Sequence, residues 1–201
     1  MIISISGLPG SGKSTVAKML AEKLGFERIY MGAIFRKMAD QKGVSILELM
    51  KMAETDSSID EEVDKYVAEL GRIKDNFIIE SRTAFHFIPK SLKVFIKVDP
   101  KEGAERIFPD LKKEERKEED KAKSAAALVQ LLKDRTETDR GRYQKYYGID
   151  FLDESNYDLI VDSTKIPPEK AMEKIMVEVE KMMAEEEGKG EEGMENKKLE
   201  S

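Results

Sequence analysis

Hydrophobic residues along this chain form two kinds of pattern, short continuous runs and helical stripes. The runs are rich in Val, Ile and Phe and predict buried strands at residues 2–5, 27–30, 76–80, 93–98 and 157–161. Between them, apolar side chains recur with the period of a helix, as in residues 13–24. Strands that alternate with helices indicate an α/β fold with a five-stranded parallel sheet and helices on both faces.

Two segments do not fit this pattern. Residues 110–123 contain 12 charged side chains, six of each sign, so we expect a solvated insert or a mobile flap. Residues 185–201 contain seven Glu, three Lys and three Gly, which predicts a disordered acidic tail. The sequence therefore predicts one ordered domain over residues 1–184.

Composition excludes several classes of protein. The chain has 35 Lys plus Arg against 41 Asp plus Glu, a net charge of −6, of which the tail accounts for −4. This acidic balance disfavours broad nucleic-acid binding, and no apolar run approaches the roughly 20 residues of a membrane span. The absence of Cys excludes disulfides, thiolate metal sites and cysteine nucleophiles, and it fits a reducing compartment. We expect a cytoplasmic protein without nucleic-acid or membrane partners.

A glycine-rich segment between the first strand and the first helix matches G-x-x-x-x-G-K-[ST] in full. Glycines allow backbone N–H groups to surround a phosphate, and the following helix directs its positive end at the same point. The motif predicts binding of a nucleoside triphosphate, with the lysine on the β- and γ-phosphates and the serine on Mg²⁺. The predicted ATP-binding residues are Gly7, Leu8, Pro9, Gly10, Ser11, Gly12, Lys13, Ser14 and Thr15.

Three further segments of the chain carry arginines where a second phosphate could bind. Arg36 lies on the helix after the second strand, and Arg82 follows the carboxyl end of the third, the edge at which such sheets bind ligands. Arg135, Asp139 and Arg142 share one helical face. Spacing alone favours an exposed face on which Asp139 pairs with either arginine. The phosphate-binding motif shifts the interpretation toward an inward-facing site.

With these motifs, the chain resembles the nucleoside monophosphate kinases of the cytidylate kinase family over residues 1–184. The motifs that carry the resemblance are the glycine-rich loop, Tyr30-Met31-Gly32-Ala33-Ile34-Phe35-Arg36 (G-x-x-x-R), Glu80-Ser81-Arg82 (E-G-R, with Ser81 in place of Gly), the R-x-x-x-D-x-x-R segment from Arg135 to Arg142, residues 146–150 and residues 157–164. Their order along the chain is far more specific than the loop alone.

The resemblance implies a three-layer P-loop kinase fold with acceptor-binding helices at about residues 32–71 and a lid at about residues 108–123. It also implies that residues 163–166 lie beside the adenine ring. Lids of this family usually carry arginines, whereas here Arg116 is the only one in the charged run, among lysines that cannot form a bidentate fork. The lysines in question are Lys112, Lys113 and Lys117. Arg106 is a further candidate at the base of the lid.

The activity that the resemblance implies is ATP plus CMP to ADP plus CDP, with dCMP as a second acceptor, by direct in-line transfer and with Mg²⁺. Lys13, Arg135 and Arg142 would be catalytic. The acceptor would be bound by Gly32, Arg36, Arg82, Asp139 and Arg142. Ser14 would ligate Mg²⁺ directly and Glu80 through water, although Glu80 fits a pairing with Arg82 or with a helix end equally well. An ionised phosphate needs no general base, so the single histidine, His86, is expected to be structural.

Two other classes remain open. One is a kinase of another small acceptor, such as AMP, UMP or dephospho-coenzyme A, because only the acceptor pocket would differ. The other is a P-loop ATPase or nucleotide-binding regulator without an acceptor, which would leave the inward-facing arginines unexplained. In each case the partners are small molecules, and we expect a monomer.

Overall fold

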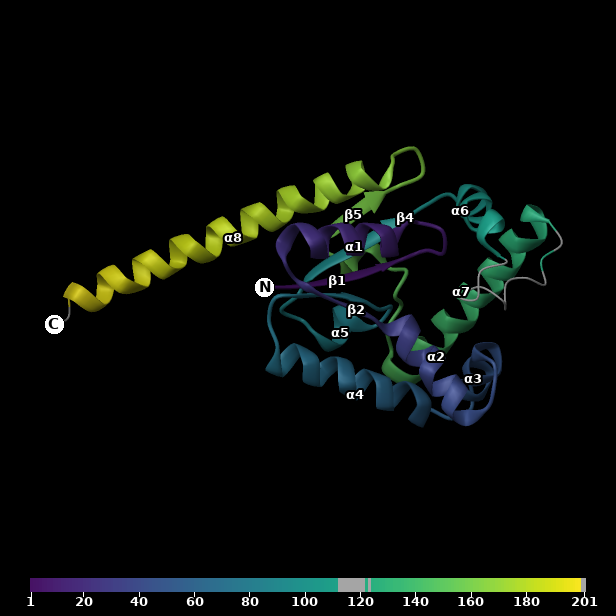
Figure 1. Cartoon of the computed structure of the whole chain (residues 1–201). Helices are drawn as coiled ribbons and strands as arrows, with labels where there is room; N and C mark the ends of the chain where they lie inside the picture. Colours follow the sequence, from purple (N-terminus) through teal and green to yellow (C-terminus); the bar gives the residue numbers. More distant parts are fainter. Residues whose placement is uncertain (112–121, 123, 200–201) are drawn as a thin grey trace.

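Five parallel strands form a sheet at the centre of the computed structural model, which describes residues 1–111, 122 and 124–199 (Figure 1). The strands are β1 (Ile2–Gly7), β2 (Glu27–Tyr30), β3 (Phe77–Glu80), β4 (Leu92–Lys97) and β5 (Leu159–Asp162). Their order across the sheet is β2-β3-β1-β4-β5. All five predicted strands are confirmed, with ends shifted by at most two residues, and so is the predicted fold class.

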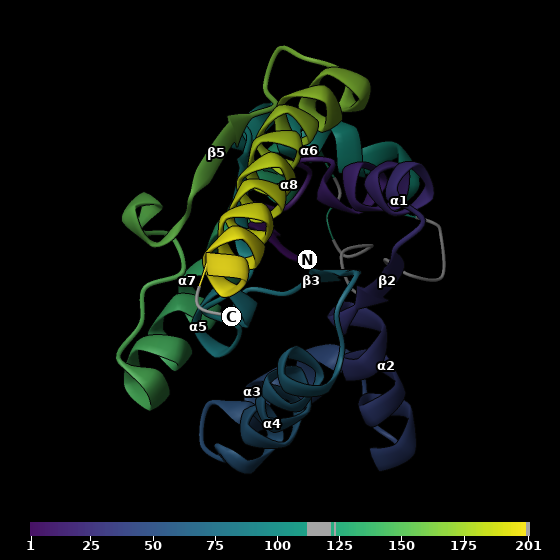
Figure 2. The same cartoon turned by 90° about the vertical axis from the view of Figure 1, so that its left-hand side faces the viewer.

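Helices connect the strands and cover both faces of the sheet. They are α1 (Lys13–Leu24), α2 (Met31–Lys42), α3 (Ile46–Ala53), α4 (Ser58–Ile73), α5 (Ala84–Phe87), α6 (Pro100–Ile107), α7 (Ala125–Tyr147) and α8 (Pro168–Leu199). In Figure 2, α1 and α8 lie on one side of the sheet, while α2, α3 and α4 lie on the other. The α1 helix spans the residues that the apolar stripe predicts.

The hydrophobic core has one part on each face of the sheet, because successive strand side chains point to opposite faces. On the α1 and α8 side, Ile3 and Ile5 pack with Ile175 and Val179 of α8. The apolar stripe of α8 is therefore part of the core. On the other side, strand residues such as Ile29, Phe77 and Ile79 pack with α2, α3 and α4.

Two segments have the S-x-x-E spacing that predicts a capping box, Ser45 with Glu48 and Ser58 with Glu61, and one of the two boxes is formed. The Ser45 side chain accepts a hydrogen bond from the Glu48 backbone, and the Glu48 carboxylate accepts one from the Ser45 backbone. At the second site, Ser57 rather than Ser58 precedes α4, and the Ser58 hydroxyl donates instead to Asp56. A carboxylate two residues before Ser58 therefore competes with the capping geometry.

The C-terminal segment differs from its expectation. The α8 helix continues to Leu199, where the composition predicts a disordered tail from residue 185, and it extends away from the sheet (Figures 1 and 2). Glu and Lys are good helix formers, so a charged segment that cannot join the core can still propagate a helix that begins in it.

The predicted lid lies almost entirely outside the described residues, which lack 112–121 and 123. Arg116, Lys112, Lys113 and Lys117 belong to that part. Among the described residues, no helix combines the length and the apolar character needed to cross a membrane.

Candidate active site

The glycine-rich loop connects β1 to α1 and folds as the motif requires. Gly10 has φ +76°, and a Cβ atom on it would lie 2.2 Å from the backbone oxygen of Gly103. Gly12 has φ +77° and caps the first turn of α1, with open space where a side chain would be. The loop therefore presents backbone and a helix N-terminus to that space, the arrangement that binds phosphates.

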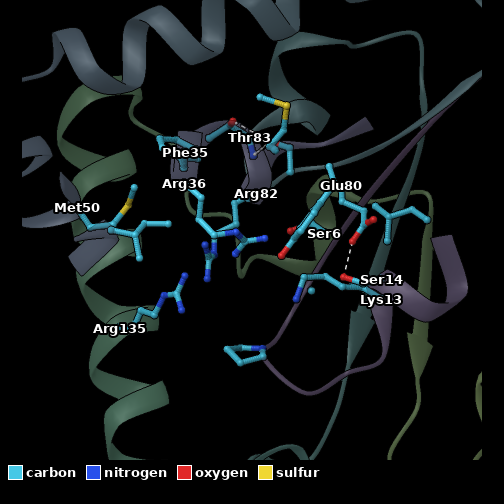
Figure 3. A pocket seen from close by; sticks show the side chains of 18 of the residues that line it. Ser6, Lys13, Ser14, Phe35, Arg36, Met50, Glu80, Arg82, Thr83 and Arg135 are labelled. Atoms are coloured by element: carbon cyan, nitrogen blue, oxygen red, sulfur yellow. Dashed lines mark hydrogen bonds between the residues drawn. The ribbon is translucent and has the colours of Figure 1, made fainter. Parts of the chain in front are cut away.

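Next to this loop is a cavity that collects most of the predicted site residues. Its lining includes Lys13, Ser14, Gly32, Arg36, Glu80, Arg82 and Arg135. Figure 3 shows the guanidinium groups of Arg36, Arg82 and Arg135 pointing toward one another in the cavity that Lys13 also lines. These arginines come from α2, the end of β3 and α7, so the fold brings together cations that are far apart in the sequence. Several cations around one cavity favour a ligand with more than one phosphate.

Glu80 links the loop to the sheet. Its side chain is 1% exposed, and Oε2 accepts a hydrogen bond of 2.6 Å from the Ser14 hydroxyl (Figure 3). Oε1 accepts a hydrogen bond of 2.6 Å from Arg28 Nε. The alternative pairing with Arg82 is not formed. Because Ser14 donates its proton to Glu80, its lone pairs remain available to a hard cation such as Mg²⁺.

This donor set fits a magnesium ion that is held mainly by substrate. The described residues contain no cluster of three or more His, Cys, Asp or Glu side chains suited to a metal. Mg²⁺ commonly takes one or two protein ligands and fills the rest of its octahedron with phosphate oxygens and water. Ser14, with Glu80 behind it, could supply that share.

Asp139 and Arg142 lie behind the cavity in a buried ionic cluster. Asp139 Oδ2 is 3.0 Å from Arg82 Nη1, and Asp139 Oδ1 is 3.1 Å from Arg142 Nη2. Arg142 Nε is 2.7 Å from Asp60 Oδ2, and both side chains are 1% exposed. The helical pairing of Asp139 with Arg142 is thus formed, but in the interior and not on an exposed face. Arg142 does not line the cavity, and Asp139 reaches it through Arg82.

Burial changes the acidity of this cluster. Loss of solvent raises the pKa of Asp60 from 3.8 to about 6, against the opposing effect of Arg142 and with the help of Asp64 and Asp139. Desolvation also raises the pKa of Asp64, whose Oδ1 accepts a hydrogen bond of 2.7 Å from Thr83. Charge in the cluster is therefore set by burial as well as by pairing.

A second recess lies on the other side of the loop. It is lined by Gly10, Ser11, Gly12, Thr15, Arg106 and residues 163–168, among others. Arg106 Nη2 donates to the carbonyl oxygens of Ser163 and Thr164, at 2.9 and 3.0 Å. Residues 163–166 thus lie beside the phosphate loop, and the hydrogen bonds from Arg106 help to hold that segment in place.

The sequence did not indicate two residues of the site, Arg28 and Asp60, because their partners are 52 and 82 positions away along the chain. Arg28 is in register with Ile78 of β3, and its side chain extends along the sheet to Glu80, two residues further on. His86 is exposed on α5 with its ring against Phe87, in keeping with a structural residue.

The fold and the site together define a P-loop phosphotransferase. The model of the cytidylate kinase-like family matches residues 2–165. The cytidylate kinase of Methanobrevibacter smithii is 35% identical over 169 residues, which cover 84% of this chain and 92% of that protein. That of Sulfolobus acidocaldarius is 36% identical and covers 88% of this chain and 92% of its own length. The chain therefore belongs to the cytidylate kinase-like family, and it is an enzyme of the nucleoside monophosphate kinase type.

Solved structures support the fold alone. The shikimate kinase of Bacteroides thetaiotaomicron has a TM-score of 0.59 at 16% identity and covers 90% of this chain and 98% of its own. An uncharacterized protein from Eubacterium ventriosum has a TM-score of 0.64 at 17% identity, with coverage of 90% and 98%.

Proposed function

We propose that this enzyme transfers the γ-phosphoryl group of ATP to CMP, and to dCMP, by direct in-line displacement. A phosphate oxygen of CMP forms a bond to the γ-phosphorus while the bond to the β-phosphate oxygen breaks, which yields CDP and ADP. The acceptor phosphate is ionised near neutral pH, so no general base is required. The choice of a cytidine nucleotide as the acceptor is supported by the names of these relatives, which are cytidylate kinases.

The observation that carries the proposal is the cavity in which three arginines face the loop lysine. A simple ATPase needs cations around one triphosphate, whereas here arginines from α2, the end of β3 and α7 line the same cavity as Lys13. Arg36 and Arg82 are assigned to the acceptor phosphate. Lys13 and Arg135 are assigned to the donor and to the charge that spreads over the transferred group.

The buried cluster is assigned to positioning. Asp139 pairs with both Arg82 and Arg142, and Arg142 pairs with Asp60 on α4. A guanidinium fixed by a buried carboxylate loses less entropy when it binds a phosphate. Asp139 is thus assigned to the acceptor site through Arg82, which it holds at the edge of the cavity. In this assignment Arg142 acts through Asp139 and not on the transferred group.

ATP is the proposed donor and Mg²⁺ the proposed cofactor. The residues suited to hold the ion are Ser14 directly and Glu80 through water. When bound, Mg²⁺ would neutralise charge on the donor phosphates. The domain limits, with acceptor helices at about 32–71 and a lid at about 108–123, remain part of the proposal, as do the monomeric state and the cytoplasmic location.

The test is a coupled assay of ADP formation over a panel of acceptors. CMP should give the highest kcat/KM, with dCMP next and AMP, UMP and dephospho-coenzyme A well below. If AMP, UMP or dephospho-coenzyme A gave a higher kcat/KM than CMP, that compound would be the acceptor in place of CMP. ADP formation at the same rate with and without any monophosphate would identify an ATPase instead.

A further inference from the structure

Tyr30, the last residue of β2, contacts two arginine side chains at the cavity. The Cζ atom of Arg28 lies over the Tyr30 ring, 5.5 Å from its centroid, and that of Arg36 lies over it at 5.2 Å. A guanidinium at this range is attracted by the negative face of the ring. Tyr30 itself lines the cavity, and the assignments above give it no role.

The first of these arginines is fixed by the sheet. Tyr30 is in register with Glu80 across the β2–β3 pair, and side chains two residues apart on a strand share a face. Arg28 therefore lies on the same face as Tyr30 and Glu80. Its Nε and Nη2 are each 2.6 Å from Oε1 of the buried Glu80 carboxylate. Arg28 is thus a rigid neighbour for the ring.

The position of the ring also depends on Gly32. A Cβ atom built on this residue would lie 2.7 Å from Cζ and 2.8 Å from Oη of Tyr30. The ring therefore occupies the space that any other residue at position 32 would fill. The contact with Arg28 and the close approach to the Gly32 backbone together fix the position of the ring. From that position the ring contacts Arg36.

We propose that Tyr30 is a positioning residue of the acceptor site, whose ring holds the Arg36 guanidinium in the orientation that binds the acceptor phosphate. The inference rests on the proposed function, because Arg36 needs a phosphorylated acceptor to act on. An arginine side chain has many rotamers, and orienting it before the ligand arrives reduces the entropy lost on binding. Arg28 in turn contacts Glu80, and Glu80 contacts Ser14, so the Tyr30 ring is linked to the residues assigned to the donor.

The test compares Tyr30→Leu with the matched variant Tyr30→Phe, which keeps the aromatic face. Tyr30→Leu should raise the KM for CMP about three- to tenfold, the range expected for a partly exposed cation–π contact. The KM for ATP should change less than twofold, and Tyr30→Phe should behave as wild type. If Tyr30→Leu does not fold in a thermal unfolding control, Tyr30→Met replaces it.

The readout that separates positioning from a general structural role is a double-mutant cycle with Arg36→Met. If Tyr30 acts through Arg36, Tyr30→Leu raises the KM for CMP no further on the Arg36→Met background. An equal increase on both backgrounds, or no increase in the wild type, overturns the inference. If wild type prefers another monophosphate, the proposed acceptor is wrong, and the same ratios measured with that acceptor decide the role of Tyr30. Absence of turnover with every acceptor overturns both.

Discussion

Replacing Arg36 by methionine removes one of the guanidiniums in the cavity and keeps much of the side-chain length. In the folded protein, Arg36 lies over the Tyr30 ring, and the loss of this contact should cost about 0.5–1 kcal/mol of unfolding free energy. In the transition state, a charge-assisted hydrogen bond to phosphate is lost, at a cost of about 2–4 kcal/mol. The two magnitudes differ enough for activity to fall while the fold persists.

The assay is steady-state ADP formation with CMP varied at saturating ATP. The kcat/KM for CMP should fall about 30- to 1000-fold, with little change in the KM for ATP. Lys37→Met is the matched control, since Lys37 is the exposed neighbour on the same helix, and it should keep wild-type kinetics. An Arg36→Met enzyme that changes only the KM for ATP would refute the acceptor role, and an equal loss in Lys37→Met would reduce the effect to general charge.

Three further predictions follow from the loop and the buried cluster. Lys13→Met should leave thermal unfolding nearly unchanged and abolish turnover; full activity would contradict its role. Gly10→Ala should lower the free energy of unfolding by about 1–3 kcal/mol and weaken ATP binding, because the added Cβ would meet Gly103 and φ is +76°. The control Gly141→Ala, which has open space around it, should stabilise α7 by about 0.5–1 kcal/mol. Wild-type ATP affinity in Gly10→Ala would contradict this. The pKa of Asp60 is about 6 in the fold, above its ordinary 3.8, so the native state binds this proton more readily and its contribution to stability is lost as pH rises from 4 to 6. The difference in unfolding free energy between wild type and Asp60→Asn should fall by about 2 kcal/mol over that window in urea titrations, and a constant difference would contradict the shift.

The fold could be predicted from local pattern to a large extent. The strands are short apolar runs and α1 is a clear amphipathic stripe ended by Gly25, so local sequence and tertiary packing favour the same elements. The sequence was less informative where local preference and tertiary packing favour different structures. The capping box that the spacing predicts at Ser58 is not formed, because the Ser58 hydroxyl donates to Asp56. The α8 helix continues past residue 185 because the core has already begun it.

The candidate site was predictable where chemistry follows chain order and less so where it follows long-range pairing. The loop motif and the strand-end position of Arg82 are local signals. Lys13 and Ser14 of the motif line the cavity, and so does Arg82. The helical spacing of Arg135 and Arg142 places them on one face, yet only Arg135 reaches the cavity. Asp60 of α4 holds Arg142 in the interior, and spacing along α7 carries no information about a partner on another helix.

The central claim is transfer to an acceptor, and the most direct measurement follows the fate of the γ-phosphoryl group. The purified full chain is incubated with γ-labelled ATP, Mg²⁺ and CMP, and the products are separated. The account predicts that the label moves into CDP in proportion to the ADP formed, with little inorganic phosphate. Label released as inorganic phosphate at the same rate with or without CMP would contradict it.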